Sequence, residues 1–390
     1  MPSVKKFIQV VNLYPLTYNT KDDMFLRTED YMLIHDTIMK ENGFDCDIVT
    51  LRAQGSKTIE TKTLGKYASD EAPVEYYEGF KITRFDTTRQ LLKYVRKHKG
   101  AIVQSNLRSF PASSFVGLPF VGSRGKRVMR SYTYVMGSSL PIALFTAAVF
   151  RRFDRILAVT PYEADVYRRW KVPGKKIRLI PLAIDYPVYS RRVPHEGVRE
   201  MFGIGKNDKV AIAVANVRKH KRYDVLLKAI PLIKQEIPDF KVVIIGEDML
   251  EKGQSLPSVA KMAADLGVSG SVLLTGFQPW NVLQQLYSLS DVFVHTAENE
   301  YQGLVSYEAA AMGIPLCLSN IGSHTSVFRE HALYHGVEDY RRLAENVVAS
   351  IRQRESRENS ISFLREHMKK WDYPVIKKQL SEMYDELISE

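Results

Sequence analysis

Cysteines and long apolar runs are scarce in this chain. Its 390 residues include two cysteines, Cys46 and Cys317, so a disulfide framework is improbable and a reducing compartment, the cytoplasm, is expected. The longest apolar stretch, residues 140–150, is far shorter than the roughly 20 residues of a membrane-spanning helix. The amino-terminal segment lacks the apolar core and small-residue cleavage site of a signal peptide, so we expect none.

Several catalytic signatures are also missing. No GxGxxG follows a predicted strand and no GxxxxGK[ST] occurs, which argues against a dinucleotide oxidoreductase and a P-loop nucleotide hydrolase. His331 and His335 have the spacing of metal ligands, but Ala332 stands where a zinc protease needs glutamate. We therefore expect both histidines at the surface, and the cysteines form no CxxC pair. The sequence predicts no metal site.

The positive charge is concentrated in the first half. The chain carries a net charge of +11, and residues 1–187 contain 30 basic and 18 acidic residues, hence +12. The whole chain has 55 basic and 44 acidic residues, so residues 188–390 contain 25 basic and 26 acidic residues, a net charge of −1. Such an excess indicates an anionic partner, either nucleic acid or a membrane surface. A generically soluble basic surface explains it equally well.

Predicted strands alternate with predicted helices along the whole chain. This alternation favours a parallel sheet covered by helices on both faces. A stretch rich in proline and glycine interrupts the pattern, which then begins again, so the length and the pattern together predict two domains. The expected fold is α/β, with two Rossmann-like doubly wound domains facing a cleft. The expected divisions are a first domain over 1–187, a linker over 188–208, a second domain over 209–370, and a helix over 371–390 that can pack back on the first domain.

The segment ENEYQGLVSYEAAAMGIP places two carboxylates around one glycine. Glu300 lies in a loop that leaves the carboxyl end of a predicted strand, and Gly303 permits close backbone approach. The amides of Leu304 and Val305 open a predicted helix, which is a site for an anion such as phosphate. Glu308, one turn later, is able to accept hydrogen bonds from vicinal hydroxyls. Acidic residues that merely stabilise the start of a surface helix are the alternative.

A known family shares this pattern. The stretch DVFVHTAENEYQGLVSYEAAAMGIPLCLSN resembles the signature of retaining GT-B glycosyltransferases of family 4, in which two glutamates flank seven residues. A second stretch, NVRKHKRYDVLLKAI, resembles the phosphate-binding segment of the same family, although Arg222 stands where the family usually has glycine. The resemblance implies catalytic roles for Glu300, Lys221 and Arg218, and donor binding by Glu308, Gly303, Leu304, Val305, Gln302 and Asn216.

The resemblance also implies an activity. Members of this family move a sugar from a nucleotide-diphosphate sugar to a hydroxyl acceptor, and they generally need neither a metal nor another cofactor. The first domain would then bind the acceptor and the second domain the donor. A catalytically silent sugar-binding or scaffold subunit with the same fold is the alternative. A nucleic-acid-binding protein is disfavoured, because no aromatic residues are interleaved with the basic ones in a reader motif.

The chain departs from the family pattern on the acceptor side. The first loop, residues 12–25, contains no glycine, although the family's loop is usually glycine-rich and touches both substrates. Asn106, Arg108 and Tyr132 stand near positions where the family often has histidine. We take these three residues as candidates for acceptor binding.

A basic segment suggests where a membrane could bind. Residues 115–130 place apolar side chains next to four basic residues, namely Arg124, Lys126, Arg127 and Arg130. This mixture is suited to an anionic bilayer surface and predicts a lipid-linked or otherwise anionic acceptor. The alternative is that the apolar residues pack in the core and the basic ones are solvated.

Overall fold

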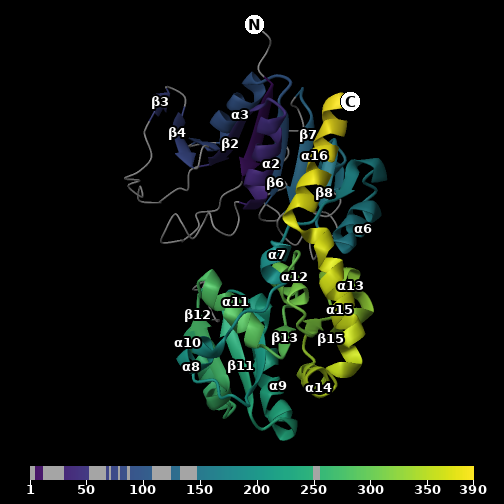
Figure 1. Cartoon of the computed structure of the whole chain (residues 1–390). Coiled ribbons are helices and arrows are strands. Elements are labelled where there is room, and N and C mark those ends of the chain that lie inside the picture. Colours follow the sequence, from purple (N-terminus) through teal and green to yellow (C-terminus); the bar gives the residue numbers. More distant parts are fainter. Residues whose placement is uncertain are drawn as a thin grey trace. The chain divides into compact units, whose positions relative to one another are not determined.

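A computed structural model describes residues 5–11, 30–51, 67–69, 72–77, 80–85, 88–107, 124–131, 147–248 and 255–390. The chain divides into two compact units. The first comprises Met1–Pro181 together with Ile376–Glu390, and the second comprises Leu182–Val375. Each unit is an α/β structure built around one sheet (Figure 1). Within the described residues, no helix is both long and apolar enough to cross a membrane.

The sheet of the first unit is mostly parallel. In spatial order its described strands are β3 (Tyr67–Ser69), β4 (Ala72–Tyr77), β5 (Phe80–Phe85), β2 (Asp45–Leu51), β1 (Lys6–Val11), β6 (Ile102–Leu107), β7 (Arg127–Ser131), β8 (Arg155–Ala158) and β9 (Ile177–Leu179). The strands from β5 to β9 pair in parallel, as the alternation predicts. The antiparallel pairs of β3 with β4 and of β4 with β5 are not predicted from the sequence.

The described helices of the first unit include the end of the chain. They include α2 (Asp30–Glu41), α3 (Thr88–Lys97), α6 (Pro161–Arg169) and most of α16 (Tyr373–Ser389). The acidic end of α16 pairs with basic residues of the sheet. Arg155 contacts Glu390 at 2.7 Å, and Arg178 contacts Glu386 at 2.6 Å. Part of the positive charge of the first half is therefore neutralised within this unit by the chain's last residues.

The sheet of the second unit is entirely parallel and doubly wound. Its described strands lie in the order β12 (Val272–Gly276), β11 (Phe240–Ile245), β10 (Lys209–Val214), β13 (Val292–His295), β14 (Leu316–Ser319) and β15 (Leu333–His335). Counted along the chain this is the order 3-2-1-4-5-6 of the dinucleotide-binding fold. The direction of winding reverses between β10 and β13, and ligands bind at the carboxyl ends of the strands at such a point.

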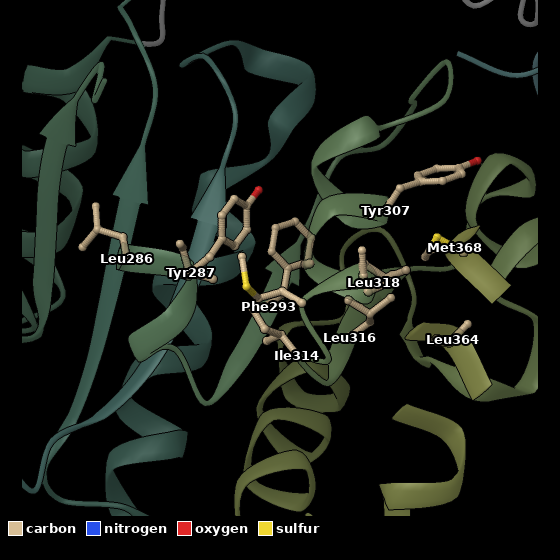
Figure 2. Packing of buried hydrophobic residues seen from close by; sticks show 14 of the residues in the cluster. Leu286, Tyr287, Phe293, Tyr307, Ile314, Leu316, Leu318, Leu364 and Met368 are labelled. Atoms are coloured by element: carbon tan, nitrogen blue, oxygen red, sulfur yellow. The ribbon is translucent and has the colours of Figure 1, made fainter. Parts of the chain in front are cut away.

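Both faces of this sheet are covered, which explains its nearly continuous apolar strands. On β10, Ala211 and Ala213 join one buried cluster, whereas Val210 and Ile212 join the other. The first cluster packs under α9 (Tyr223–Glu236), α10 (Leu256–Asp265) and α14 (Tyr340–Arg352). The second, shown in Figure 2, packs under α11 (Trp280–Leu289), α12 (Leu304–Ala311) and α15 (Glu358–His367). The strand ends are thereby held in fixed positions.

The predicted linker is structured. Residues 188–208 contain the end of α7 (Tyr186–Tyr189) and all of α8 (Glu196–Met201). Val198 and Ile204 are 2% and 4% exposed and belong to the core of the second unit. This segment is therefore packed on the second unit and is not a free tether.

Candidate functional site

The predicted donor residues lie at the point where the second sheet reverses its winding. The turn after β10 carries Lys221, and the loop after β13 carries Glu300. Strands β10 and β13 are neighbours in parallel register, with Ala211 opposite Val292. Their carboxyl ends consequently meet at one edge of the sheet. Backbone bonds join the two connections there, since the Glu298 amide donates to the His220 carbonyl at 2.9 Å.

Lys221 and Glu300 form an ion pair at this edge. The Nζ of Lys221 donates to Oε2 of Glu300, and both side chains are largely buried, at 14% and 16% exposed. The Nε2 of His295, the last residue of β13, lies 3.2 Å from the same carboxylate oxygen. Burial alone would raise the pKa of Glu300, but the Lys221 ammonium and His295 outweigh burial and hold this pKa well below its usual range. Glu300 is therefore ionised throughout the neutral range.

The conformation of the turn that carries Lys221 explains how Arg222 can stand where the family usually has glycine. The residue adopts φ 50° and ψ 46°, the left-handed conformation in which glycine is favoured. Its guanidinium is bidentate to Asp224, at 2.9 and 3.1 Å, and lies 3.3 Å from Glu338. These ion pairs offset the backbone strain of roughly 1–2 kcal/mol. The turn thus keeps the geometry that glycine would give, with an arginine in its place.

Gly303 is required by both its conformation and its neighbours. It adopts φ +70°, and a Cβ at this position would lie 2.8 Å from Cγ of Glu300. Helix α12 starts directly afterwards with Leu304 and Val305, which are partly exposed. The carbon stem of Glu300 therefore lies against Gly303, the residue that directly precedes this helix.

Gln302 does not serve the role expected of it. Its side chain is 1% exposed, and both of its amide atoms bond to the backbone of Leu182. Its Oε1 accepts from the Leu182 amide at 2.7 Å, and its Nε2 donates to the Leu182 carbonyl at 3.0 Å. The prediction of donor contact for Gln302 is corrected: this side chain fastens the loop within the second unit.

Asn216 and Arg218 frame the beginning of the turn after β10. Both are partly buried. The Oδ1 of Asn216 accepts from the Glu247 amide at 3.2 Å, which ties this turn to the end of β11. The Arg218 carbonyl accepts from the Lys221 amide at 2.9 Å. Arg218 therefore shapes the backbone of the turn, and its side chain lies on the same short segment as Lys221.

Glu308 has a partner that sequence reasoning missed. It lies one turn into α12, and its Oε2 accepts a hydrogen bond from the Tyr287 hydroxyl at 3.0 Å. Tyr287 is fully buried on α11, and burial together with the charge of Glu308 raises its pKa well above its usual value. Tyr287 therefore remains a hydrogen-bond donor and fixes one oxygen of the Glu308 carboxylate.

On the first unit, Asn106 lies in the interior. It is 1% exposed; its Nδ2 donates to Oε1 of Gln9 at 2.9 Å, and its Oδ1 accepts from Gln104 at 2.9 Å. Its amide is thus used within the unit, which corrects the expectation that it contacts an acceptor. The other two acceptor candidates, Arg108 and Tyr132, lie outside the described residues, as does the loop of residues 12–25.

Arg130 is buried as well, so its prediction as a membrane contact is wrong. It is 1% exposed, with Nη1 2.9 Å from Nε2 of His35 and Nη2 donating to the Ile180 carbonyl at 3.2 Å. Both faces of a parallel strand are covered, so an arginine on β7 points into the interior. The remaining three basic residues are accessible to different degrees. Arg124 is exposed, Lys126 lies 3.9 Å from Glu390, and Arg127 lies 3.4 Å from Asp154.

Three buried histidines were not predicted as part of this site. His295 ends β13, His324 lies on α13 (Gly322–Phe328), and His335 ends β15. They are 4%, 0% and 1% exposed, so the expected surface position of His335 is wrong. Within the described residues, no group of three or more potential ligands is arranged to hold a metal ion. The signal that could have marked His295 is a polar residue at the carboxyl end of a buried strand.

Two family models match the chain over most of its length. The model described as Glycosyl transferases group 1 matches residues 196–367, and the model described as Glycosyltransferase Family 4 matches residues 39–186. Mannosylfructose-phosphate synthase of Agrobacterium fabrum is 26% identical over 199 residues, which are 48% of this chain and 42% of that protein. A GDP-mannose-dependent alpha-(1-6)-phosphatidylinositol monomannoside mannosyltransferase of Mycolicibacterium smegmatis is 23% identical over 299 residues, 70% of this chain and 76% of that protein.

A solved structure shares the fold along the whole chain. Sucrose-phosphate synthase from Thermosynechococcus elongatus superposes with a TM-score of 0.75 over 99% of both chains, at 16% sequence identity. At this identity the likeness concerns the fold. Together with the two family models, it shows that the chain belongs to the family 4, group 1 glycosyltransferases and has the GT-B fold.

Proposed function

We propose that this protein transfers a sugar from a nucleotide-diphosphate sugar to a hydroxyl of an acceptor, with retention of the anomeric configuration. The observation that carries the proposal is the Lys221–Glu300 ion pair beside the first amides of α12, at the switch point of a 3-2-1-4-5-6 sheet. The turn after β10 and the loop after β13 together supply a cation, helix amides and a carboxylate at this edge of the sheet. A phosphate next to a sugar ring matches that combination.

The proposed chemistry develops charge at two places. The bond between the anomeric carbon and the diphosphate oxygen breaks, so negative charge grows on the diphosphate and positive charge on the sugar ring. Lys221, Arg218 and the α12 amides stabilise the diphosphate electrostatically. Glu300 orients the ring and stabilises its positive charge. The acceptor oxygen bonds to the anomeric carbon from the face that the diphosphate leaves, and the acceptor proton passes to the departing diphosphate.

Glu308 is assigned to the nucleotide end of the donor. Its carboxylate lies one helical turn beyond the amides that would bind the diphosphate, which is the direction in which the ribose follows. The hydrogen bond from the Tyr287 hydroxyl to Oε2 holds this carboxylate in one orientation. Vicinal ribose hydroxyls would donate to this carboxylate in charge-assisted hydrogen bonds.

We further propose that the transfer is independent of metal ions. Lys221, Arg218 and the helix amides supply the positive charge that a divalent ion would bring to the diphosphate. Turnover should therefore be equal with excess EDTA and with added magnesium. A strict requirement for magnesium would contradict this part of the proposal.

The acceptor is proposed to be anionic, and lipid-linked acceptors are the first class to test. The excess of +12 over residues 1–187 supports an anionic acceptor, and the name of the Mycolicibacterium relative specifies phosphatidylinositol monomannoside, a glycolipid, for that protein. A phosphorylated soluble sugar is the competing class. Supplying each in turn with the identified donor distinguishes them.

A donor panel tests the proposed function. Purified protein is incubated with UDP-, GDP- and ADP-sugars, and slow hydrolysis, thermal stabilisation and the anomeric configuration of the product are measured. One donor should stabilise the wild type and turn over, whereas Lys221→Ala should turn over about 10²–10³-fold more slowly. The neighbouring exposed Lys219→Ala is the matched control, since both residues lie on the same short helix. Absence of binding and hydrolysis with every donor would favour a silent scaffold subunit.

A further inference from the structure

The buried histidines near Glu300 have an unusual environment. The rings of His295 and His324 lie edge to face, with centroids 4.9 Å apart. The Nδ1 of His324 lies 3.0 Å from the Ser319 carbonyl, which can only accept, so this nitrogen carries the hydrogen. Burial lowers the pKa of His295 and of His335, and it lowers the pKa of His324 to about 3. All three rings are therefore neutral at neutral pH.

Two donors bind Glu300, and the Nε2 of His295, which has no hydrogen-bond partner of its own among the described residues, lies beside it. Its Oε2 accepts from Lys221 and lies 3.2 Å from Nε2 of His295, while its Oε1 accepts from the Tyr301 amide at 3.2 Å. The backbone of Gly303 closes over the carbon stem of the side chain. Of these partners, Lys221 is the residue that would bind the proposed diphosphate. When the nucleotide-sugar binds, Oε2 of Glu300 therefore loses the hydrogen bond from Lys221.

His295 differs from Lys221 in how firmly it is fixed. Lysine carries its charge on a flexible four-carbon stem. His295 ends a buried strand, is 4% exposed, and its ring lies between Phe293 and His324. A neutral imidazole in such a place is costly unless it makes a hydrogen bond, because buried polar groups lose their contacts with water. Glu300 is the polar side chain that its Nε2 approaches.

We propose that His295 is a positioning residue, whose Nε2–H keeps the Glu300 carboxylate directed at the sugar when Lys221 turns to the diphosphate. This inference rests on the proposed function for the identity of the ligand. The titratable groups that face His295 are Glu300, Lys221, His324 and His335. Because the His295 ring is itself neutral, it can donate a hydrogen bond to Glu300 without adding a charge beside the sugar.

The test compares two replacements of His295 with one control. His295→Phe keeps a planar ring and removes the donor, whereas His295→Gln keeps an N–H donor. His331→Phe is the matched control, because His331 lies in the same unit and stacks on Phe363 with ring centroids 4.0 Å apart. Unfolding midpoints for all variants establish that they fold.

The first measurement does not depend on any activity. The Glu300 carboxyl is labelled with ¹³C, assigned through Glu300→Gln and titrated. Loss of a donor to the ionised form raises a carboxyl pKa, so His295→Phe should raise the pKa of Glu300 by about half a unit or more. His295→Gln should raise it less, and His331→Phe should leave it unchanged. An unchanged titration in His295→Phe overturns the proposal, even if the wild type proves to bind no nucleotide-sugar.

The second measurement uses the donor found in the panel. Misplacement of a reacting group by about 1 Å commonly costs on the order of 100-fold, so kcat of His295→Phe should fall about 10–100-fold. Its KM for the donor should stay within about threefold, because uniform binding is retained. His295→Gln should recover most of the loss. A shifted titration with unchanged kcat, or a fall in kcat that Gln does not recover, also overturns the positioning role.

Discussion

The stability of the second unit should fall as the pH drops below about 6.5, and His324 is the residue that sets this dependence. The side chain is fully buried, with its Nδ1–H directed at the Ser319 carbonyl. Burial, together with the nearby His295, lowers its pKa from 6.5 to about 3. The unfolded chain therefore binds a proton at a pH at which the folded unit does not.

The magnitude follows from proton linkage. Unfolding is favoured by the extra proton of the unfolded state at about 1.36 kcal/mol per pH unit. The contribution is small above pH 6.5, grows as the pH falls, and stops growing near pH 3, where the folded unit also binds the proton. At pH 5.0 the loss is about 2 kcal/mol from His324 alone. The lowered pKa values of His295 and His335 add to it with the same sign.

Urea unfolding at pH 7.5 and pH 5.0 measures the effect. His324→Gln keeps a donor for the Ser319 carbonyl but cannot titrate, so its loss between the two pH values should be about 2 kcal/mol smaller than that of the wild type. Tyr334→Phe is a control, because burial raises the pKa of Tyr334 away from this range. It should leave the pH dependence unaltered. Equal losses in the wild type and His324→Gln would refute the reasoning.

Four further outcomes are expected from the site and the surface. Lys221→Ala should lower turnover about 10²–10³-fold, and its unfolding midpoint should fall because Glu300 loses a buried ion-pair partner; near-full turnover would exclude contact of Lys221 with the diphosphate. Glu308→Gln should weaken donor binding by roughly 1.5–3 kcal/mol in calorimetry; unchanged affinity would remove Glu308 from the site. Arg222→Gly should be more stable than Arg222→Ala by about 1 kcal/mol, because glycine relieves the left-handed strain, and the reverse order in urea would contradict that account. Replacing exposed Arg124 and half-buried Lys126 with glutamate should weaken binding to anionic vesicles by roughly 30-fold or more at low salt; a wild type that does not bind such vesicles would refute the membrane hypothesis.

The sequence predicts that the loops carrying Lys221 and Glu300 each follow a strand, and the sheet, in which those two strands are neighbours, explains why these loops meet. Glu300 and Lys221 are 79 residues apart, yet each follows a strand that the apolar runs reveal. Parallel strands bring such loops to one edge, so the spacing around Gly303 was enough to predict the helix start. The order of the strands was not predictable from these patterns, because it depends on which apolar faces pack against which helices.

Tertiary packing explains the residues that sequence reasoning missed or misplaced. A strand buried on both faces hides polar side chains as well as apolar ones. We therefore predicted Arg130 on β7 at the surface, and we did not single out His295 because it lies in the apolar run of β13. Gln302 read as part of a binding loop, but its amide fits the Leu182 backbone. The partners that place Arg130 and Gln302 include His35, 95 residues away, and Leu182, 120 residues away along the chain.

Arg124 and Lys126 lie at the edge of the first sheet opposite to the carboxyl ends of its parallel strands. Arg124 and Lys126 precede β7, so they lie at the amino ends of the parallel strands. Ligands of doubly wound sheets bind at the carboxyl ends, beyond Asn106 on the neighbouring β6. A bilayer held against Arg124 and Lys126 would therefore not place its lipids at the carboxyl ends of these strands. Membrane binding and a lipid-linked acceptor are thus separate properties, and neither result can be used to infer the other.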